Sequence, residues 1–113
     1  MVSINTFKDL ALSFPETEAS PHFDKISFRV NKKIFATLSE KEEIACLKFS
    51  AIDQSVFSSF DKTIIYPVPN KWGQQGWTFV ALKNIRKEML LDALTRAYCA
   101  VAPKRLAALF ADQ

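Results

Sequence analysis

The chain has 113 residues, 49% of them hydrophobic and 12% aromatic, and its net charge is +3. This length and composition exclude intrinsic disorder and let a hydrophobic core form without disulfide or metal staples. No run approaches the roughly 20 apolar residues of a membrane span, and the N-terminus lacks a leader pattern. Cys46 and Cys99 are far apart and are interpreted as buried, reduced thiols. We therefore expect one cytoplasmic domain over residues 1–113, with no membrane contact.

The first element expected is an amphipathic helix. Its apolar residues recur at i, i+3, i+4 and i+7, namely Phe7, Leu10, Ala11 and Phe14. Ser3 is placed to cap this helix and Pro15 to end it. The polar segment Glu16–Pro21 then predicts a loop.

Three strands are expected next. Ile26–Val30 alternates apolar and polar residues, and Ile34–Leu38 and Ile44–Phe49 continue the pattern. Asn31-Lys32 suits a two-residue turn because asparagine tolerates positive φ. The three runs predict an antiparallel meander with Lys32-Lys33 at one hairpin tip.

A short helix and two further strands follow. Ser50 starts a capping-box pattern, and the buried side of the helix is expected to consist of Ile52, Val56, Phe57 and Phe60. Thr63–Val68 predicts a strand that either lies at the edge of the sheet or ends at its prolines, because proline gives up a ladder donor. Both glycines lie in the next loop, before a last strand over Trp77–Leu82.

The C-terminal part predicts two helices. Asn84 is placed to cap the longer one, whose buried side would contain Leu90, Leu94, Ala97, Tyr98 and Val101. Pro103 suits the first turn of the shorter one. The order α-β-β-β-α-β-β-α-α predicts an α+β fold, with an antiparallel five-stranded sheet and helices packed mainly on one face.

Several blocks resemble the MmcQ/YjbR-like family of small bacterial proteins. They are Pro21–Lys25, Phe28–Ala36, Pro67–Trp77 and Ala102–Leu106, and together they extend over almost the whole chain. The resemblance implies an antiparallel sheet backed by helices, similar to the type III secretion chaperone architecture. It also implies DNA binding through a winged arrangement. The family often has glycine after the phenylalanine of the first block, where this chain has Asp24.

No catalytic or cofactor site assembles from the sequence. His22 is the only histidine, and no nucleophile lies near it in the chain. One histidine and two isolated cysteines are too few for a zinc site. The two glycines form neither a Walker nor a dinucleotide-binding motif. We therefore expect a non-enzymatic binding module without metal or cofactor.

The segment Tyr66–Trp77 is the most distinctive stretch, and two interpretations of it stay open. It presents a flat aromatic and amide surface to a ligand, made of Lys71, Trp72, Gln74, Gln75 and Trp77. Alternatively, Gly73 and Gly76 supply positive φ while the tryptophans close the end of the core.

A polar sheet face and a basic turn are the other candidate sites. Strand alternation places Ser27 and Arg29 opposite the core, and Lys48 and Thr78 also alternate with apolar neighbours. The arginine fork suits phosphate or carboxylate. An ordinary solvated sheet face and an ordinary soluble turn remain the alternatives.

DNA is the first partner expected. The nucleic-acid contacts expected from the sequence are Arg29, Lys32, Lys33, Lys71, Trp72 and Gln75. The second hypothesis is a protein-interaction module, chaperone-like or self-associating. A third is a small-ligand site between the tryptophan loop and His22.

Overall fold

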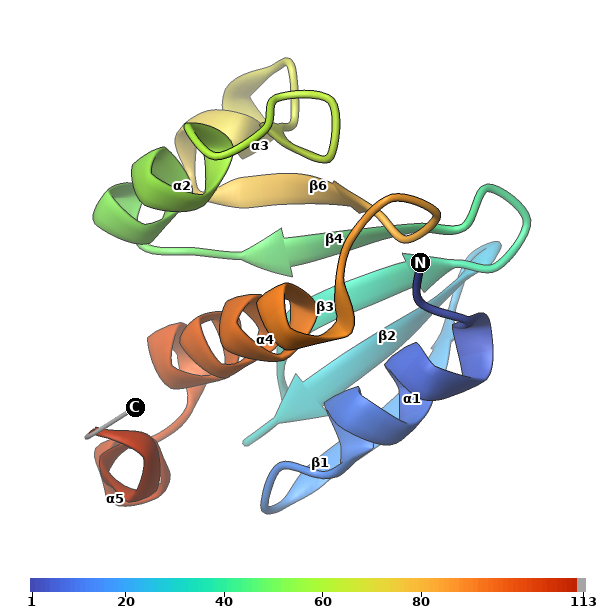
Figure 1. The fold of residues 1–113 in the computed structure, drawn as a ribbon. Coiled ribbons are helices and arrows are strands. Elements are labelled where there is room, and N and C mark those ends of the chain that lie inside the picture. Colours follow the sequence, from blue (N-terminus) through green and yellow to red (C-terminus); the bar gives the residue numbers. More distant parts are fainter. Residues whose placement is uncertain (112–113) are drawn as a thin grey trace.

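The computed structural model describes residues 1–111 and contains one six-stranded antiparallel sheet, in the order β1-β2-β3-β4-β6-β5 (Figure 1). Its strands are β1 (Thr17–His22), β2 (Lys25–Val30), β3 (Lys33–Ser39), β4 (Ile44–Lys48), β5 (Ile65–Pro67) and β6 (Trp77–Ala81). Its helices are α1 (Ile4–Leu12), α2 (Ala51–Ser58), α3 (Lys71–Gln74), α4 (Lys87–Val101) and α5 (Lys104–Ala107), followed by the 3-10 turn η1 (Ala108–Phe110). The α+β class with an antiparallel sheet is confirmed.

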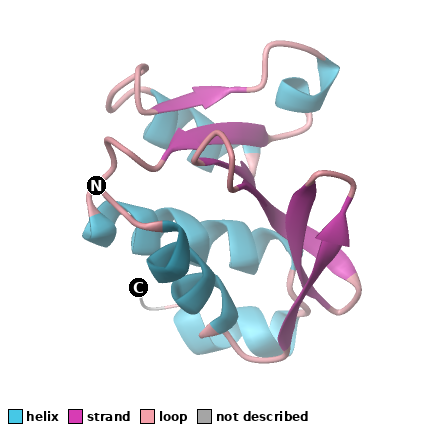
Figure 2. Cartoon of the chain, turned by 90° about the vertical axis from the view of Figure 1, so that its right-hand side faces the viewer, coloured by secondary structure: helices cyan, strands magenta, loops and turns pink. Residues whose placement is uncertain are grey.

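The helices are divided unequally between the two faces of the sheet. Figures 1 and 2 show α1 and α4 lying across one face, with the short α3 on the other side. Most of the second face is therefore left without a helical cover.

None of the helices over residues 1–111 is both long and apolar enough to cross a membrane.

Aromatic rings make the core between the sheet and the helices. Tyr98 of α4 stacks on Phe14 at 4.9 Å between ring centroids and meets Phe35 edge to face at 5.7 Å. Its hydroxyl donates to the carbonyl of Pro15 at 2.8 Å, which satisfies the one polar group of the ring. Phe7 of α1 packs against Phe28 of β2 at 5.5 Å. These contacts fix both helices on the sheet.

A β-bulge in the β2–β3 pair sets which side chains face the core. Phe28 pairs with Ala36, whereas Arg29 pairs with Ile34, so the register shifts between them. Phe35 and Ala36 are both buried as a result. Arg29 and Ile34 consequently point to the face that α1 and α4 leave open.

The caps expected at Ser3 and Ser50 and the turn expected at Asn31-Lys32 are confirmed. Ser3 and Ser50 accept hydrogen bonds from the amides of Thr6 and Asp53. Asn31 and Lys32 have φ values of 51° and 66°, which is the geometry of a type I′ hairpin turn. The cap expected at Asn84 is wrong. The first residue of α4 is Lys87, and the Asn84 amide instead donates to the Ala81 carbonyl in a turn.

The expected loop Glu16–Pro21 is mostly a strand, which makes six strands instead of five. Thr17–His22 pairs with β2 along its whole length, from Thr17 with Val30 to His22 with Lys25. The segment is polar and contains Pro21, so it lacks the alternation that marks a strand. An edge strand tolerates proline because only one side needs ladder donors, and β1 lies at the edge.

The expected buried side of α2 is largely exposed. The exposed fractions are 77% for Ile52, 60% for Val56 and 72% for Phe60. Only Phe57 packs inward, stacked on Phe49 at 5.0 Å. The apolar spacing identified the helix correctly, but over the described residues nothing covers this side.

Candidate functional site

A groove of about 480 Å³ lies on the sheet face opposite α4. Residues of the β1–β2 turn line one side of it, and residues of α3 and its preceding loop line the other. Figure 2 shows where these two segments lie relative to the sheet. The floor of the groove includes one register row, in which Thr37, Cys46 and Phe79 lie side by side. The residues that line it are His22, Phe23, Asp24, Lys25, Ile34, Thr37, Cys46, Val68, Trp72, Trp77 and Phe79.

The α3 wall presents an indole ring at the groove. The Asn70 side chain caps α3 by accepting from the Trp72 amide at 2.8 Å. Trp72 remains 51% exposed. The ring therefore closes part of the groove while leaving a large surface for a ligand.

Gly73 brings α3 close to the strand before it. A Cβ at this position would lie 1.9 Å from the carbonyl oxygen of Val68. Positive φ was expected at both glycines, but only Gly76 has it, at 105°. Gly73 is helical, and it is required by the close backbone approach instead.

Gln54 of α2, which lies outside the groove, holds α3 in place. Its amide nitrogen donates to the carbonyl of Gly73 at 2.8 Å and to the hydroxyl of Thr78 at 3.1 Å. One side chain thus ties α2, α3 and β6 together. The position of Trp72 consequently depends on side chains outside the groove.

The opposite wall carries an unusual phenylalanine. Phe23 is 94% exposed and has a φ of 60°, in the left-handed region that costs a side-chain-bearing residue energy. The His22 ring meets it edge-on at 5.0 Å. A strained turn that holds an exposed ring beside a groove makes Phe23 a candidate ligand contact. Phe23 was not among the contacts expected from the sequence, although a phenylalanine between polar turn residues was a usable signal.

Three basic side chains share the groove's face of the sheet. Lys25 lines the groove and lies 3.6 Å from the Asp24 carboxylate. Arg29, half-buried, donates from Nε to the Ser27 hydroxyl at 3.3 Å. Lys48 donates to the backbone carbonyl of Gln75 and lies 5.9 Å from the Trp77 ring centroid. Lys48 was expected on this face from strand alternation, whereas Lys25 was not selected from the sequence.

The nucleic-acid contacts expected from the sequence are only partly brought together. Trp72 lines the groove and Arg29 shares its face, while exposed Lys71 adjoins Trp72. Gln75 ends α3 as its C-cap and is exposed. Lys32 and Lys33, exposed at the β2–β3 turn, are not part of the groove lining.

The polar open face expected from strand alternation is wrong for Thr78 and only partly right for Ser27, since both side chains are fully buried. Ser27 does lie on the open face, where it pairs with Thr37, but it is not solvated. Thr78 pairs with the core residue Leu47 and donates to the Gly76 carbonyl at 3.0 Å, so it belongs to the other face. The floor of the groove is instead mainly apolar. The small-ligand hypothesis gains support, because His22 and Trp72 line the same groove.

The groove contains one thiol, and its surroundings keep it protonated. Burial raises the pKa of Cys46 to about 11. Because the thiolate is the reactive form, this side chain is a poor nucleophile at neutral pH. Besides this thiol, the lining offers aromatic rings, the His22 imidazole, the Lys25 ammonium group and the Asp24 carboxylate.

Comparisons with known proteins agree with this architecture. A family model described as YjbR matches residues 12–100. The chain is similar to the Deinococcus radiodurans protein DR2400, whose crystal structure contains a domain described as DUF419, with a TM-score of 0.78 and 18% sequence identity. That match covers 93% of this chain and 82% of the other, and at this identity it establishes the fold alone. A comparison with curated proteins finds no match.

Proposed function

The chain belongs to the YjbR family, and from this premise we propose that it is a non-enzymatic DNA-binding module whose sheet-face groove holds an unpaired base. One observation supports this most strongly. A ring-lined groove is flanked by the exposed side chains of Phe23 and Trp72, with basic side chains on the same face. Bases stack on exposed aromatic rings whatever their sequence.

The rings favour an unpaired base over a stacked one. In a duplex both faces of each base are covered by neighbouring base pairs, so Trp72 and Phe23 could not reach them. In a single strand, a base can turn toward a ring, and each stacked base contributes about 1–3 kcal/mol. The rings on opposite walls of the groove suit one flat base between them.

The charges fit a short contact with a phosphate backbone. Lys25, Arg29 and Lys48 share the face, and Lys71 adjoins Trp72. Three or four phosphate contacts give a single-strand salt slope of about −2 to −3. The modest net charge of +3 agrees with such a footprint better than with a long duplex track.

The alternative form of DNA binding is contact with a duplex through the β2–β3 turn, instead of contact with a single strand in the groove. Lys32 and Lys33 are exposed there, as a DNA wing would require. Reversing both charges separates the two forms, since it weakens duplex binding and leaves base stacking intact.

Binding without chemistry is also part of this proposal. Cys46, the nucleophile of the groove, is held as a thiol by its raised pKa of about 11. The free thiols of Cys46 and Cys99 fit a reducing compartment, so we place the module's action in the cytoplasm.

Fluorescence anisotropy with labelled oligothymidine and with a duplex of equal length tests the proposal. We expect tighter binding to the single strand. We also expect Trp72→Ala and Phe23→Ala each to lower its affinity about 5- to 150-fold. Leu109→Ala, which changes an apolar side chain that is 63% exposed on η1, is the matched control and should have no effect.

Charge variants complete the test. Lys25→Glu should weaken binding, whereas Lys104→Glu, at an exposed position on α5 outside the groove, should not. Absence of binding to either oligonucleotide at low salt would refute DNA as the partner. Retained binding by Trp72→Ala and Phe23→Ala, together with loss on reversing Lys32 and Lys33, would move the contact to the turn.

A further inference from the structure

The exposed side of α2 is the second surface that needs an explanation. Ile52, Val56 and Phe60 recur every four residues and form one apolar stripe, with exposed fractions from 60% to 77%. Ile52 and Val56 lie on α2, and Phe60 lies in the turn that follows it. Leaving three such side chains in water forfeits a hydrophobic gain of about 1.5–3 kcal/mol for each large one. Contiguous exposed apolar surface of this kind is typical of a contact with another molecule.

The stripe borders a groove of about 520 Å³ between α2 and the start of α4. Its lining consists of Val56, Phe57, Phe60, Arg86, Glu88, Met89 and Asp92. None of these residues lines the groove on the sheet face. The two surfaces can therefore be occupied independently.

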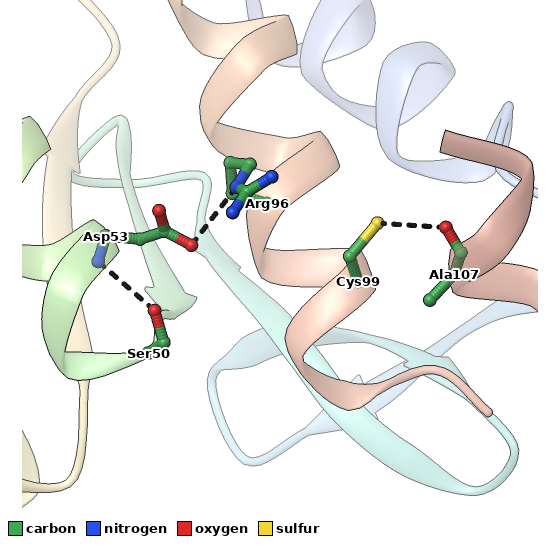
Figure 3. Close-up of polar contacts among 5 residues, drawn as sticks. All are labelled: Ser50, Asp53, Arg96, Cys99 and Ala107. Atoms are coloured by element: carbon green, nitrogen blue, oxygen red, sulfur yellow. Dashed lines mark hydrogen bonds and ion pairs between the residues drawn. The ribbon is translucent and has the colours of Figure 1, made fainter. Parts of the chain in front are cut away.

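An ion pair fixes how α2 presents the stripe. Figure 3 shows Arg96 of α4 reaching Asp53 in the first turn of α2, with Nε 3.1 Å from Oδ2. Asp53 is held in place because its amide donates to Ser50 at 3.1 Å. Phe57, one turn later, stacks on Phe49, so the helix is also anchored on its inner side. The stripe is consequently held outward instead of turning into the core.

The rim of this groove carries charges of both signs. Arg86 lies at one point of the rim, and Glu88 and Asp92 lie along α4 beside it. Within residues 1–111 none of the three forms an ion pair. A two-fold axis that passes between Arg86 and the two acidic residues would place the partner's acidic side chains opposite Arg86 and its arginine opposite Glu88 and Asp92.

We propose that this stripe and groove are the site where a second copy of the chain docks, in a two-fold dimer. A two-fold interface uses the same patch on both subunits, so the patch must be complementary to itself. This patch meets that condition, because an exposed apolar stripe adjoins a groove lined by both apolar side chains and charges of both signs. The dimer leaves the sheet-face groove of each subunit open.

Sedimentation equilibrium over a range from about 1 µM to about 1 mM tests the dimer, since mass action makes association depend on concentration. We expect the wild-type chain to move from monomer to dimer. The double variant Val56→Ser/Phe60→Ser should stay monomeric, shifting the dissociation constant more than 10-fold. Leu109→Ser, at a distant exposed position, should behave as wild type. Far-UV circular dichroism confirms that each variant is folded.

A charge exchange tests the two-fold geometry. Arg86→Glu makes the rim wholly acidic, and Glu88→Arg/Asp92→Arg makes it wholly basic. Each variant alone should be monomeric, and an equimolar mixture should form the heterodimer. A wild-type chain that stays monomeric over the whole range overturns the proposal. Self-association that survives Val56→Ser/Phe60→Ser, or a charge mixture that does not associate, overturns it as well.

Discussion

Replacing Gly73 with alanine should destabilise the protein, although alanine is the better helix former. In an exposed helix this change gains about 1 kcal/mol. Here a Cβ would lie 1.9 Å from the carbonyl oxygen of Val68 and 2.9 Å from its carbon. These are backbone atoms, so no side-chain rotation can relieve the clash. Either α3 or the strand end must move, and overpacking of this kind costs about 1–3 kcal/mol.

Thermal unfolding followed by far-UV circular dichroism measures this effect. For a chain of this size, 1 kcal/mol corresponds to roughly 4 °C in Tm, so we expect a fall of about 4–12 °C. Gln74→Ala is the matched control, because Gln74 is exposed in the same helix and its change should stay within about 0.5 kcal/mol. The displaced α3 should also weaken oligothymidine binding by moving Trp72. A Gly73→Ala variant as stable as wild type would refute the close-approach argument.

Three further predictions concern single groups. Tyr98→Phe should lower the free energy of unfolding by about 1–2 kcal/mol in urea titration, since it leaves the Pro15 carbonyl without its 2.8 Å donor; unchanged stability would contradict this. Cys46 has a pKa of about 11, so it should react with iodoacetamide only slowly at pH 8 and faster as the pH rises toward that value. Rapid alkylation of the native protein at pH 8 would show an accessible thiolate and contradict this prediction. The Arg105 hydrogen bond lowers the pKa of Glu16, so the pair stabilises the fold above the carboxylate's unfolded pKa and loses this effect as pH falls through the lowered one. Arg105→Ala should therefore lower Tm slightly at neutral pH and not in acid, and an equal shift at both would count against the pair.

Local chemistry explains which elements the sequence predicted well. The Asn31-Lys32 turn and the Ser50 cap each depend on residues within a few positions of one another, so their signals are complete in the chain. β1 was missed because its pairing with β2 gives it strand geometry, while its own residues are polar and include Pro21. An edge strand of this kind has no hydrophobic pattern to detect.

The candidate site was harder to predict because it depends on which surfaces remain uncovered. Apolar spacing in α2 predicted a helix, but it could not show that Val56 and Phe60 have nothing packed on them. Strand alternation placed Thr78 on the polar open face. In the fold its side chain lies on the opposite face of the sheet, where its hydroxyl accepts a hydrogen bond from Gln54. The hypothesis of a site between His22 and the tryptophan loop was closest, since the folded chain forms a groove there.

We propose above that the sheet-face groove binds single-stranded DNA by stacking on Trp72, with help from nearby cations. The most direct measurement is oligothymidine affinity for wild type and Trp72→Ala across a series of salt concentrations. We expect both to weaken with a slope of about −2 to −3, while the ratio between them stays constant at about 5 or more, because counterion release governs the slope and stacking governs the ratio. A ratio of one at every salt concentration would contradict the account.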